Sequence, residues 1–123
     1  MRSRIVKPGL FSNEEMAELP IPTRYLFVAL WCLADREGLL EDRPKRIRGE
    51  VFPFDEIDLE PMLQELYEHQ FIVRYEYEGQ RVISIPRWHK HQKCHRREAA
   101  SILPKYVQGQ SKDSPRTRLV PAL

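Results

Sequence analysis

The stretch that decides the fold is LFVALWCLADREGLLEDRPKRIRGEVFP, residues 26–53. Its first half is apolar at nearly every position, which predicts a central helix packed by neighbours on several sides. A charged turn ending at Gly38, a residue suited to a left-handed cap, ends this helix. The second half carries four cations and no acid within residues 43–48. A buried helix followed at once by a basic surface element is typical of small nucleic-acid-binding modules.

The basic second half predicts a short helix over residues 44–50, with Pro44 in its first turn and Asp42 as its cap. Ile47 and Val51 are expected to face the core, which leaves the cations outside. Cations on such a face contact DNA phosphates, which supply most of the non-specific affinity. The alternative is a solvated face whose cations pair with nearby acids. The candidate DNA-binding residues here are Arg43, Lys45, Arg46 and Arg48.

Upstream, the chain is expected to hold a basic N-terminal arm, residues 1–11, and a short helix over residues 13–19. Ser12 and Glu15 have the spacing of a capping box at the start of that helix. Pro20 ends it, because proline disfavours a helical conformation in the residue before it.

Downstream, apolar residues spaced three and four apart predict a helix over residues 58–69, capped by Asp58. Gln64 and Glu65 are expected on its solvent face. Residues 55–68 hold six acids and no Lys or Arg, so this surface repels a phosphate backbone. It is either an ordinary solvated face or a contact surface for another protein.

The hydrophobic period then changes from 3.6 to 2, and two alternating runs around a turn at Gly79 predict a β-hairpin over residues 71–85. Tyr75 is expected to pack on the core. Arg74 and Arg81 are the candidate contacts of this hairpin with phosphates or the minor groove.

The expected order of elements is helix, helix, short strand, short helix, helix and hairpin. This is the order of a winged helix-turn-helix domain, in which the hairpin is the wing. The predicted fold class is therefore α+β and mainly helical, with the winged domain over residues 12–86 and its two-stranded hairpin at the C-terminal end. Residues 87–104 are expected to pack on this domain as a basic, histidine-rich extension, and residues 105–123 to form a flexible tail.

Charge is divided along the chain. The net charge of +2 combines −5 in residues 1–85 with +7 in residues 86–123. The extension alternates cations with histidines and with Trp88, which is expected to anchor it on the domain. Basic residues interleaved with an aromatic make a nucleic-acid patch. Its candidate DNA-binding residues are Arg87, Lys90, Lys93, Arg96 and Arg97.

The same extension contains four residues of zinc-ligand type. Four ligands within seven residues rarely close a tetrahedron, so no metal or cofactor is expected. No phosphate-binding glycine loop or nucleophile elbow occurs, so the chain is not expected to be an enzyme. A metal-dependent nuclease is the remote alternative. The residues of a zinc site here would be His89, His91, Cys94 and His95.

No apolar run approaches the ~18 residues of a membrane-spanning helix, and no signal peptide follows the basic N-terminus. Cys32 and Cys94 fit a reducing compartment. A cytoplasmic protein without membrane contact is therefore expected. The oligomeric state is open, because the sequence contains no coiled-coil seam.

The segments LADREG (33–38), EDRPKRI (41–47) and WHKHQ (88–92) resemble the N-terminal domain of phage and prophage replication proteins, known as replication initiators or replisome organisers. The resemblance extends over about residues 8–104. It implies a winged-helix fold, DNA binding and a part in starting phage DNA replication. Longer chains of that family carry a further C-terminal region that would engage the helicase machinery.

The function expected from residues and resemblance together is DNA binding, mainly through phosphate contacts, in the initiation or organisation of phage DNA replication. Two alternatives remain open besides the nuclease. One is a protein-interaction module of a replication complex that uses the acidic surface of residues 55–68. The other is a winged-helix transcriptional regulator.

Overall fold

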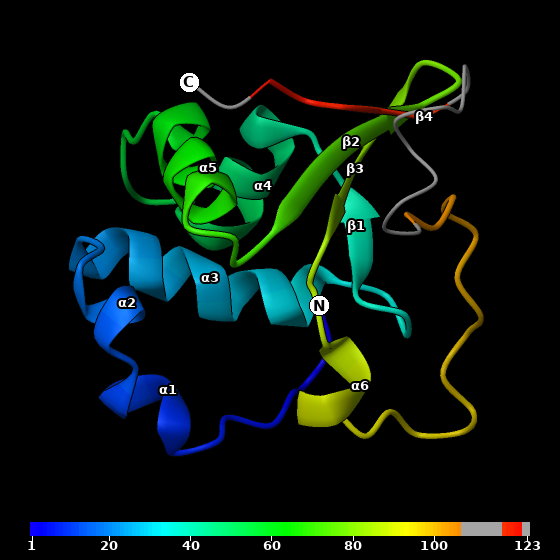
Figure 1. Ribbon diagram of the computed structural model, residues 1–123, viewed down its shortest axis with the longest axis horizontal. Coiled ribbons are helices and arrows are strands. Elements are labelled where there is room, and N and C mark those ends of the chain that lie inside the picture. Colours follow the sequence, from blue (N-terminus) through cyan, green and yellow to red (C-terminus); the bar gives the residue numbers. More distant parts are fainter. Residues whose placement is uncertain (107–116, 122–123) are drawn as a thin grey trace.

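The computed structural model describes residues 1–106 and 117–121 (Figure 1). Within these ranges the chain is an α+β fold with six helices and one four-stranded antiparallel sheet, which confirms the mixed class. The helices are α1 (Gly9–Ser12), α2 (Glu14–Ala17), α3 (Ile21–Leu33), α4 (Pro44–Val51), α5 (Leu59–Glu68) and α6 (Trp88–His91), and the strands are β1 (Leu39–Glu41), β2 (Val73–Tyr77), β3 (Gln80–Ser84) and β4 (Thr117–Leu119).

Helix α3 is the centre of the core, as its apolar sequence predicts. Leu26 and Leu30 of this helix are completely buried, as are Leu63 and Leu66 of α5, which packs against it. Burial of each such side chain contributes about 1.5–3 kcal/mol. In Figure 1, α4 and α5 lie on one side of α3, and α1 and α6 lie on the other.

The N-terminal segment differs from the expectation at two points. The end of the expected arm is helical, since residues 9–12 form helix α1, and Phe11 is 81% exposed although Leu10 packs on the core. The cap of the next helix is Asn13, not Ser12. The Asn13 side chain accepts a hydrogen bond from the Met16 amide at 3.0 Å, because it stands directly before the first helical residue.

The sheet has the strand order β1-β3-β2-β4. Strands β2 and β3 form the expected hairpin, from the pair Val73–Ser84 to the pair Tyr77–Gln80. Its two-residue turn has positive φ at Glu78 (49°) and Gly79 (85°), the requirement of a tight hairpin turn. Strand β1 pairs with β3 and continues directly into α4.

Strand β4 comes from the expected flexible tail, residues 105–123. Residues 117–119 pair with the outer edge of β2, and the following residues reach α5 (Figure 1). At the start of the same tail, Tyr106 packs on Tyr75 with ring centroids 5.3 Å apart. Residues 107–116 and 122–123 lie outside the described part of the chain.

Candidate nucleic-acid interface

Helix α4 presents a basic face to solvent. Its register is fixed by Ile47 and Val51, one turn apart and both buried, as the sequence predicts. On the opposite side, the side chains of Arg43 and Arg46 are 60% and 69% exposed, and Lys45 is exposed between them. We call these three residues the α4 basic face.

Among the described residues, one acid forms ion pairs with this face, and Glu50 lines the same hollow as Arg43 and Arg46. A carboxylate oxygen of Glu41 lies 3.4 Å from Arg43 and 3.9 Å from Arg46. Exposed pairs of this kind are weak, at about 0–1 kcal/mol, so both guanidinium groups are available to a stronger anion. Arg48, the fourth predicted cation of the helix, is half-buried and donates to the Asp55 carbonyl at 2.7 Å.

Of the two hairpin arginines, one remains a candidate for DNA contact. The side chain of Arg81 is 41% exposed and lies 3.5 Å from Asp42, directly before the α4 basic face. Arg74 is completely buried. The prediction that Arg74 contacts DNA is therefore wrong, because the side chain points into the protein and is enclosed by acids.

Arg74 is the centre of a buried ionic cluster. It donates two hydrogen bonds to Asp42, at 2.7 and 2.9 Å, and two to Glu60, at 2.8 and 2.9 Å. It also donates to the Gln64 side chain at 3.1 Å. Burial opposes the charge on Arg74, but the hydrogen bonds with Asp42 and Glu60 outweigh it and raise the pKa of the guanidinium. The bond with Arg74 also lowers the pKa of Glu60.

This cluster corrects the prediction that Asp42 caps α4. The cap position is Arg43, which makes no capping side-chain hydrogen bond, while the Asp42 carboxylate is buried against Arg74. A buried arginine needs paired acceptors more than the first turn of a short exposed helix needs a cap, since an unpaired buried charge is far more costly. The cluster thereby joins β2 to α5 and to the start of α4.

Helix α5 begins with the predicted cap: the Asp58 side chain accepts from the Glu60 amide at 3.3 Å. Its predicted solvent face is wrong at Gln64, which is buried and donates to the Pro121 carbonyl at 3.1 Å. Tyr67 donates to the Val120 carbonyl at 2.6 Å. The segment after β4 therefore covers part of α5, so this helix is not a fully open surface.

Acidic side chains form much of the exposed surface around α5. Glu60 and Glu68 are exposed on the helix itself, and three more acids are exposed in the loop and at the cap before it. The neighbouring Phe54 is 96% exposed. We call Phe54 and these loop acids the acidic loop: Phe54, Asp55, Glu56 and Asp58.

The extension packs on the domain through residues other than its candidate DNA-binding cations. Trp88 is buried and donates to the Arg36 carbonyl at 2.8 Å, as its expected anchoring role requires. Glu98 forms ion pairs with Arg4 at 2.7 Å and Arg2 at 3.0 Å. The hydrogen bond with Arg4 lowers the pKa of Glu98. The arginines of the N-terminal arm thus fasten the extension, a role that the sequence pattern did not indicate.

The cations of the extension remain on the surface: Arg87, Lys90, Lys93, Arg96 and Arg97 are all exposed. The cations at α6, Arg87 and Lys90, do not form one group with the α4 basic face. In Figure 1, α4 and α6 lie on opposite sides of α3. Arg87 and Lys90 therefore belong to a second basic surface, whereas Ala99 and Ala100, which follow Arg97 and Glu98, line a hollow together with Arg43 and Arg46.

The four residues considered as zinc ligands have different environments. His89 lies 2.8 Å from a Glu37 oxygen, and Cys94 lies 3.4 Å from an Arg4 nitrogen. His91 lines a pocket at the base of α6, and its pKa is lowered by burial and by nearby cations, Lys7 first among them. His95 accepts from the Arg97 amide. No group of three potential metal ligands occurs within residues 1–106 and 117–121.

The described helices include none that is long and apolar enough to cross a membrane. Comparison of the chain with protein-family models, with curated proteins and with solved structures found no match.

Proposed function

We propose that this chain is a winged-helix protein that binds DNA mainly through the α4 basic face and takes part in starting phage or prophage DNA replication. The order α3-β1-α4-α5-β2-β3 supports the winged fold. So does the sheet, in which β1 lies beside β3 and the β2–β3 hairpin follows α5 as a wing. The part in replication rests on the resemblance of residues 8–104 to phage replication proteins.

The observation that carries the proposal is the exposure of Arg43, Lys45 and Arg46 at a helix whose opposite side is buried in the core. Exposed cations held on a rigid helix form an electrostatic footprint for a phosphate backbone. Arg81 extends this footprint toward the wing, since it pairs with the residue directly before Arg43.

Helix α5, which stands at the position of the recognition helix in a winged-helix domain, is a poorer candidate for DNA contact. The first turn of α5 carries Glu60, and the acidic loop precedes it. The segment at Val120 also covers Tyr67 of this helix. In this chain α4 therefore takes the larger share of the DNA contact. Binding dominated by phosphates has little sequence preference, because phosphates carry no base information.

The test is fluorescence anisotropy of labelled duplex and single-stranded DNA with the full chain. The variant is Arg43→Glu/Arg46→Glu, and the matched control is Arg87→Glu/Lys90→Glu, which changes the net charge equally on the second basic surface. We expect the α4 variant to lose at least about tenfold in affinity, and the control to lose less, because two phosphate contacts are replaced by repulsion.

Equal losses in the two variants would overturn the assignment to α4, because net charge alone would then explain binding. A larger loss in the control would move the interface to the extension. Failure of the unmodified chain to bind either form of DNA at low salt would overturn the DNA-binding function itself.

One observation favours a second function, contact with another protein. Phe54 is 96% exposed beside Asp55, Glu56 and Asp58, and an exposed aromatic among acids suits a basic partner surface with an apolar pocket. Crosslinking to the purified replication helicase of the host cell tests it. Phe54→Ser should abolish the crosslink while leaving DNA affinity unchanged, and a crosslink that persists in this variant would refute it.

A further inference from the structure

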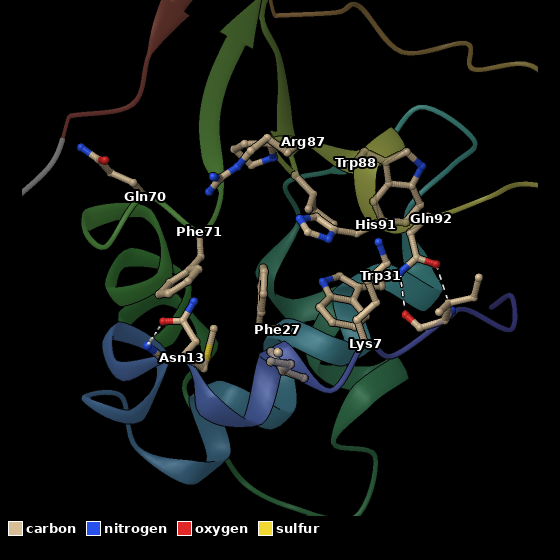
Figure 2. A pocket seen from close by; sticks show the side chains of 16 residues that line it. Lys7, Asn13, Phe27, Trp31, Gln70, Phe71, Arg87, Trp88, His91 and Gln92 are labelled. Atoms are coloured by element: carbon tan, nitrogen blue, oxygen red, sulfur yellow. Dashed lines mark hydrogen bonds between the residues drawn. The ribbon is translucent and has the colours of Figure 1, made fainter.

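A pocket of about 390 Å³ lies between the N-terminal arm, α3, the turn after α5, and α6 (Figure 2). This volume falls in the range of small-molecule sites, about 300–1,000 Å³. The pocket is separate from the α4 basic face, because none of its sixteen lining residues belongs to α4. Neither DNA binding nor the resemblance assigns it a role.

Aromatic rings form the apolar side of the pocket. Figure 2 shows Phe27 between Phe71 and Trp31. The centroid of the Phe27 ring lies 5.3 Å from that of Trp31 and 5.4 Å from that of Phe71. Trp88 of α6 also lines the pocket. Tilted and edge-on rings at these distances make a surface on which a further flat ring packs well.

Basic groups form the polar side. Lys7, Arg87 and His91 line the pocket, and none of its lining residues, all within the described chain, is an acid. Lys7 already donates to the Lys90 carbonyl at 2.7 Å. The side chains of Arg87 and His91 make no hydrogen bond or ion pair within residues 1–106 and 117–121. In Figure 2, Arg87 and His91 lie at the same side of the pocket, above Phe27.

The backbone adds an independent indication. Arg87 and Gln70, which both line the pocket, have φ of 57° and 64°, in the left-handed region that residues with a Cβ rarely adopt. Three non-glycine residues of the described chain have positive φ, and these are two of them. Such conformations gather at functional sites, where the surrounding structure holds a side chain in a required place.

Two glutamates lie near the pocket without lining it. Glu14 and Glu15 line a neighbouring hollow, which shares Asn13, Gln70 and Arg87 with the pocket. Arg87 therefore stands between an acidic hollow and an acid-free pocket. No acid of the described protein lines the pocket, so an anion bound there gains an ionic contact with Arg87.

We propose that this pocket binds a small planar aromatic anion. The ring packs against Phe27, Trp31 and Phe71, and the anionic group accepts hydrogen bonds from Arg87 at the pocket rim. An anionic ring is favoured over a neutral one because it gains a charge-assisted hydrogen bond with Arg87, and over a cationic one because Arg87 repels a positive charge. A small aromatic acid and a nucleotide both carry this chemistry.

The chain provides its own reporters, because its two tryptophans, Trp31 and Trp88, both line the pocket. The ¹H–¹⁵N spectrum of the full chain therefore contains two indole signals. The probes are 2-naphthoate, its uncharged analogue 2-naphthamide, and thymidine monophosphate. We expect naphthoate to shift both indole signals in a saturable manner. Naphthamide should bind at least about tenfold more weakly, since a hydrogen bond between two charged groups is lost.

Arg87→Gln is the decisive variant, and Lys93→Gln is its control, because Lys93 is an exposed cation of the same extension that does not line the pocket. We expect Arg87→Gln to weaken naphthoate binding about tenfold or more and to leave naphthamide unchanged. Tighter binding of thymidine monophosphate than of naphthoate assigns the site to a nucleotide, and the reverse to a small aromatic acid.

Three results would overturn the proposal: no shift of either indole signal with naphthoate or the nucleotide, equal affinity for naphthoate and naphthamide, or unchanged naphthoate affinity in Arg87→Gln. Arg87 is exposed, so its replacement should leave the fold intact. The ¹H–¹⁵N spectrum of the Arg87→Gln variant shows directly whether it is folded.

Discussion

Replacement of Arg74 by methionine should destabilise the protein strongly, although it replaces no residue of the α4 basic face. The side chains of Arg74 and Asp42 are both 0% exposed, and two hydrogen bonds at 2.7 and 2.9 Å join them. Arg74→Met leaves the Asp42 carboxylate buried, with the distant contact to Arg81 at 3.5 Å as its remaining ion pair among the described residues. Glu60 loses less, since its side chain is 49% exposed and can turn to water.

Removal of one partner from a buried ion pair costs about 3–5 kcal/mol. For 123 residues, this cost lowers the thermal midpoint by about 12–20 °C. Urea unfolding followed by circular dichroism gives the free energy directly. The matched control is Arg118→Met, which removes the same group from an exposed pair with Glu76 at 3.4 Å and should cost less than about 1 kcal/mol.

The double variant Asp42→Leu/Arg74→Met separates the cost of leaving the Asp42 carboxylate unpaired from the net contribution of the ion pair to stability. It removes both buried charges, so its free energy of unfolding should return to within about 2 kcal/mol of that of the unmodified protein. A cost of less than about 1 kcal/mol for Arg74→Met, or a double variant less stable than the single one, would refute the reasoning that the buried charge needs its partner.

Two further predictions concern the extension. In urea unfolding, Gly38→Ala should destabilise the fold about 1–3 kcal/mol more than Gly79→Ala. Both glycines have positive φ, but an added Cβ at Gly38 lies 2.7 Å from the Trp88 ring, whereas at Gly79 it has no neighbour within 4 Å. Equal costs of the two substitutions would contradict the close packing of Trp88. The lowered pKa of Glu98 means that its pairing with Arg4 stabilises the fold above the ordinary carboxyl pKa of 4.5 and is lost as pH falls through the lowered value. Glu98→Gln should therefore flatten the dependence of the thermal midpoint on pH below about 4.5, and an unchanged acid profile would count against this role.

The helices and the hairpin were predictable because their hydrophobic periods are strong and local. In α5, Leu59, Leu63 and Leu66 repeat at helical spacing and are all buried, and the hairpin alternates around a glycine that the tight turn requires. The α4 basic face followed from the same logic. Once Ile47 and Val51 face inward, Lys45 and Arg46 on the other side of the helix face solvent.

The prediction for Arg74 was wrong because an alternating strand pattern indicates an exposed side chain only where one face of the sheet is open to solvent. Strand β2 is covered on both faces: α5 lies on the side of Arg74, and the chain near Pro104 lies on the side of Tyr75, whose hydroxyl donates to the Pro104 carbonyl at 2.6 Å. A short local window contains no signal for a cover that comes from residues far away in the sequence.

Strand β4 and the pocket were missed for the same reason. The β4 residues read as part of a polar tail, and they become a strand only because β2 offers an unpaired edge. The pocket combines Lys7, Phe27, Phe71 and Arg87 from four separate segments. Each of these residues has an ordinary local explanation, and their chemistry together exists only after folding.

The salt dependence of duplex binding tests the central claim, that the α4 basic face carries the DNA contact, most directly. The three phosphate contacts of Arg43, Lys45 and Arg46 should contribute about −2.7 to the slope in a plot of log affinity against log salt. In Arg43→Gln/Arg46→Gln the slope should flatten by about 1.8, while Arg118→Gln on the far edge of the sheet should leave it unchanged. An unchanged slope in the α4 variant would contradict the account.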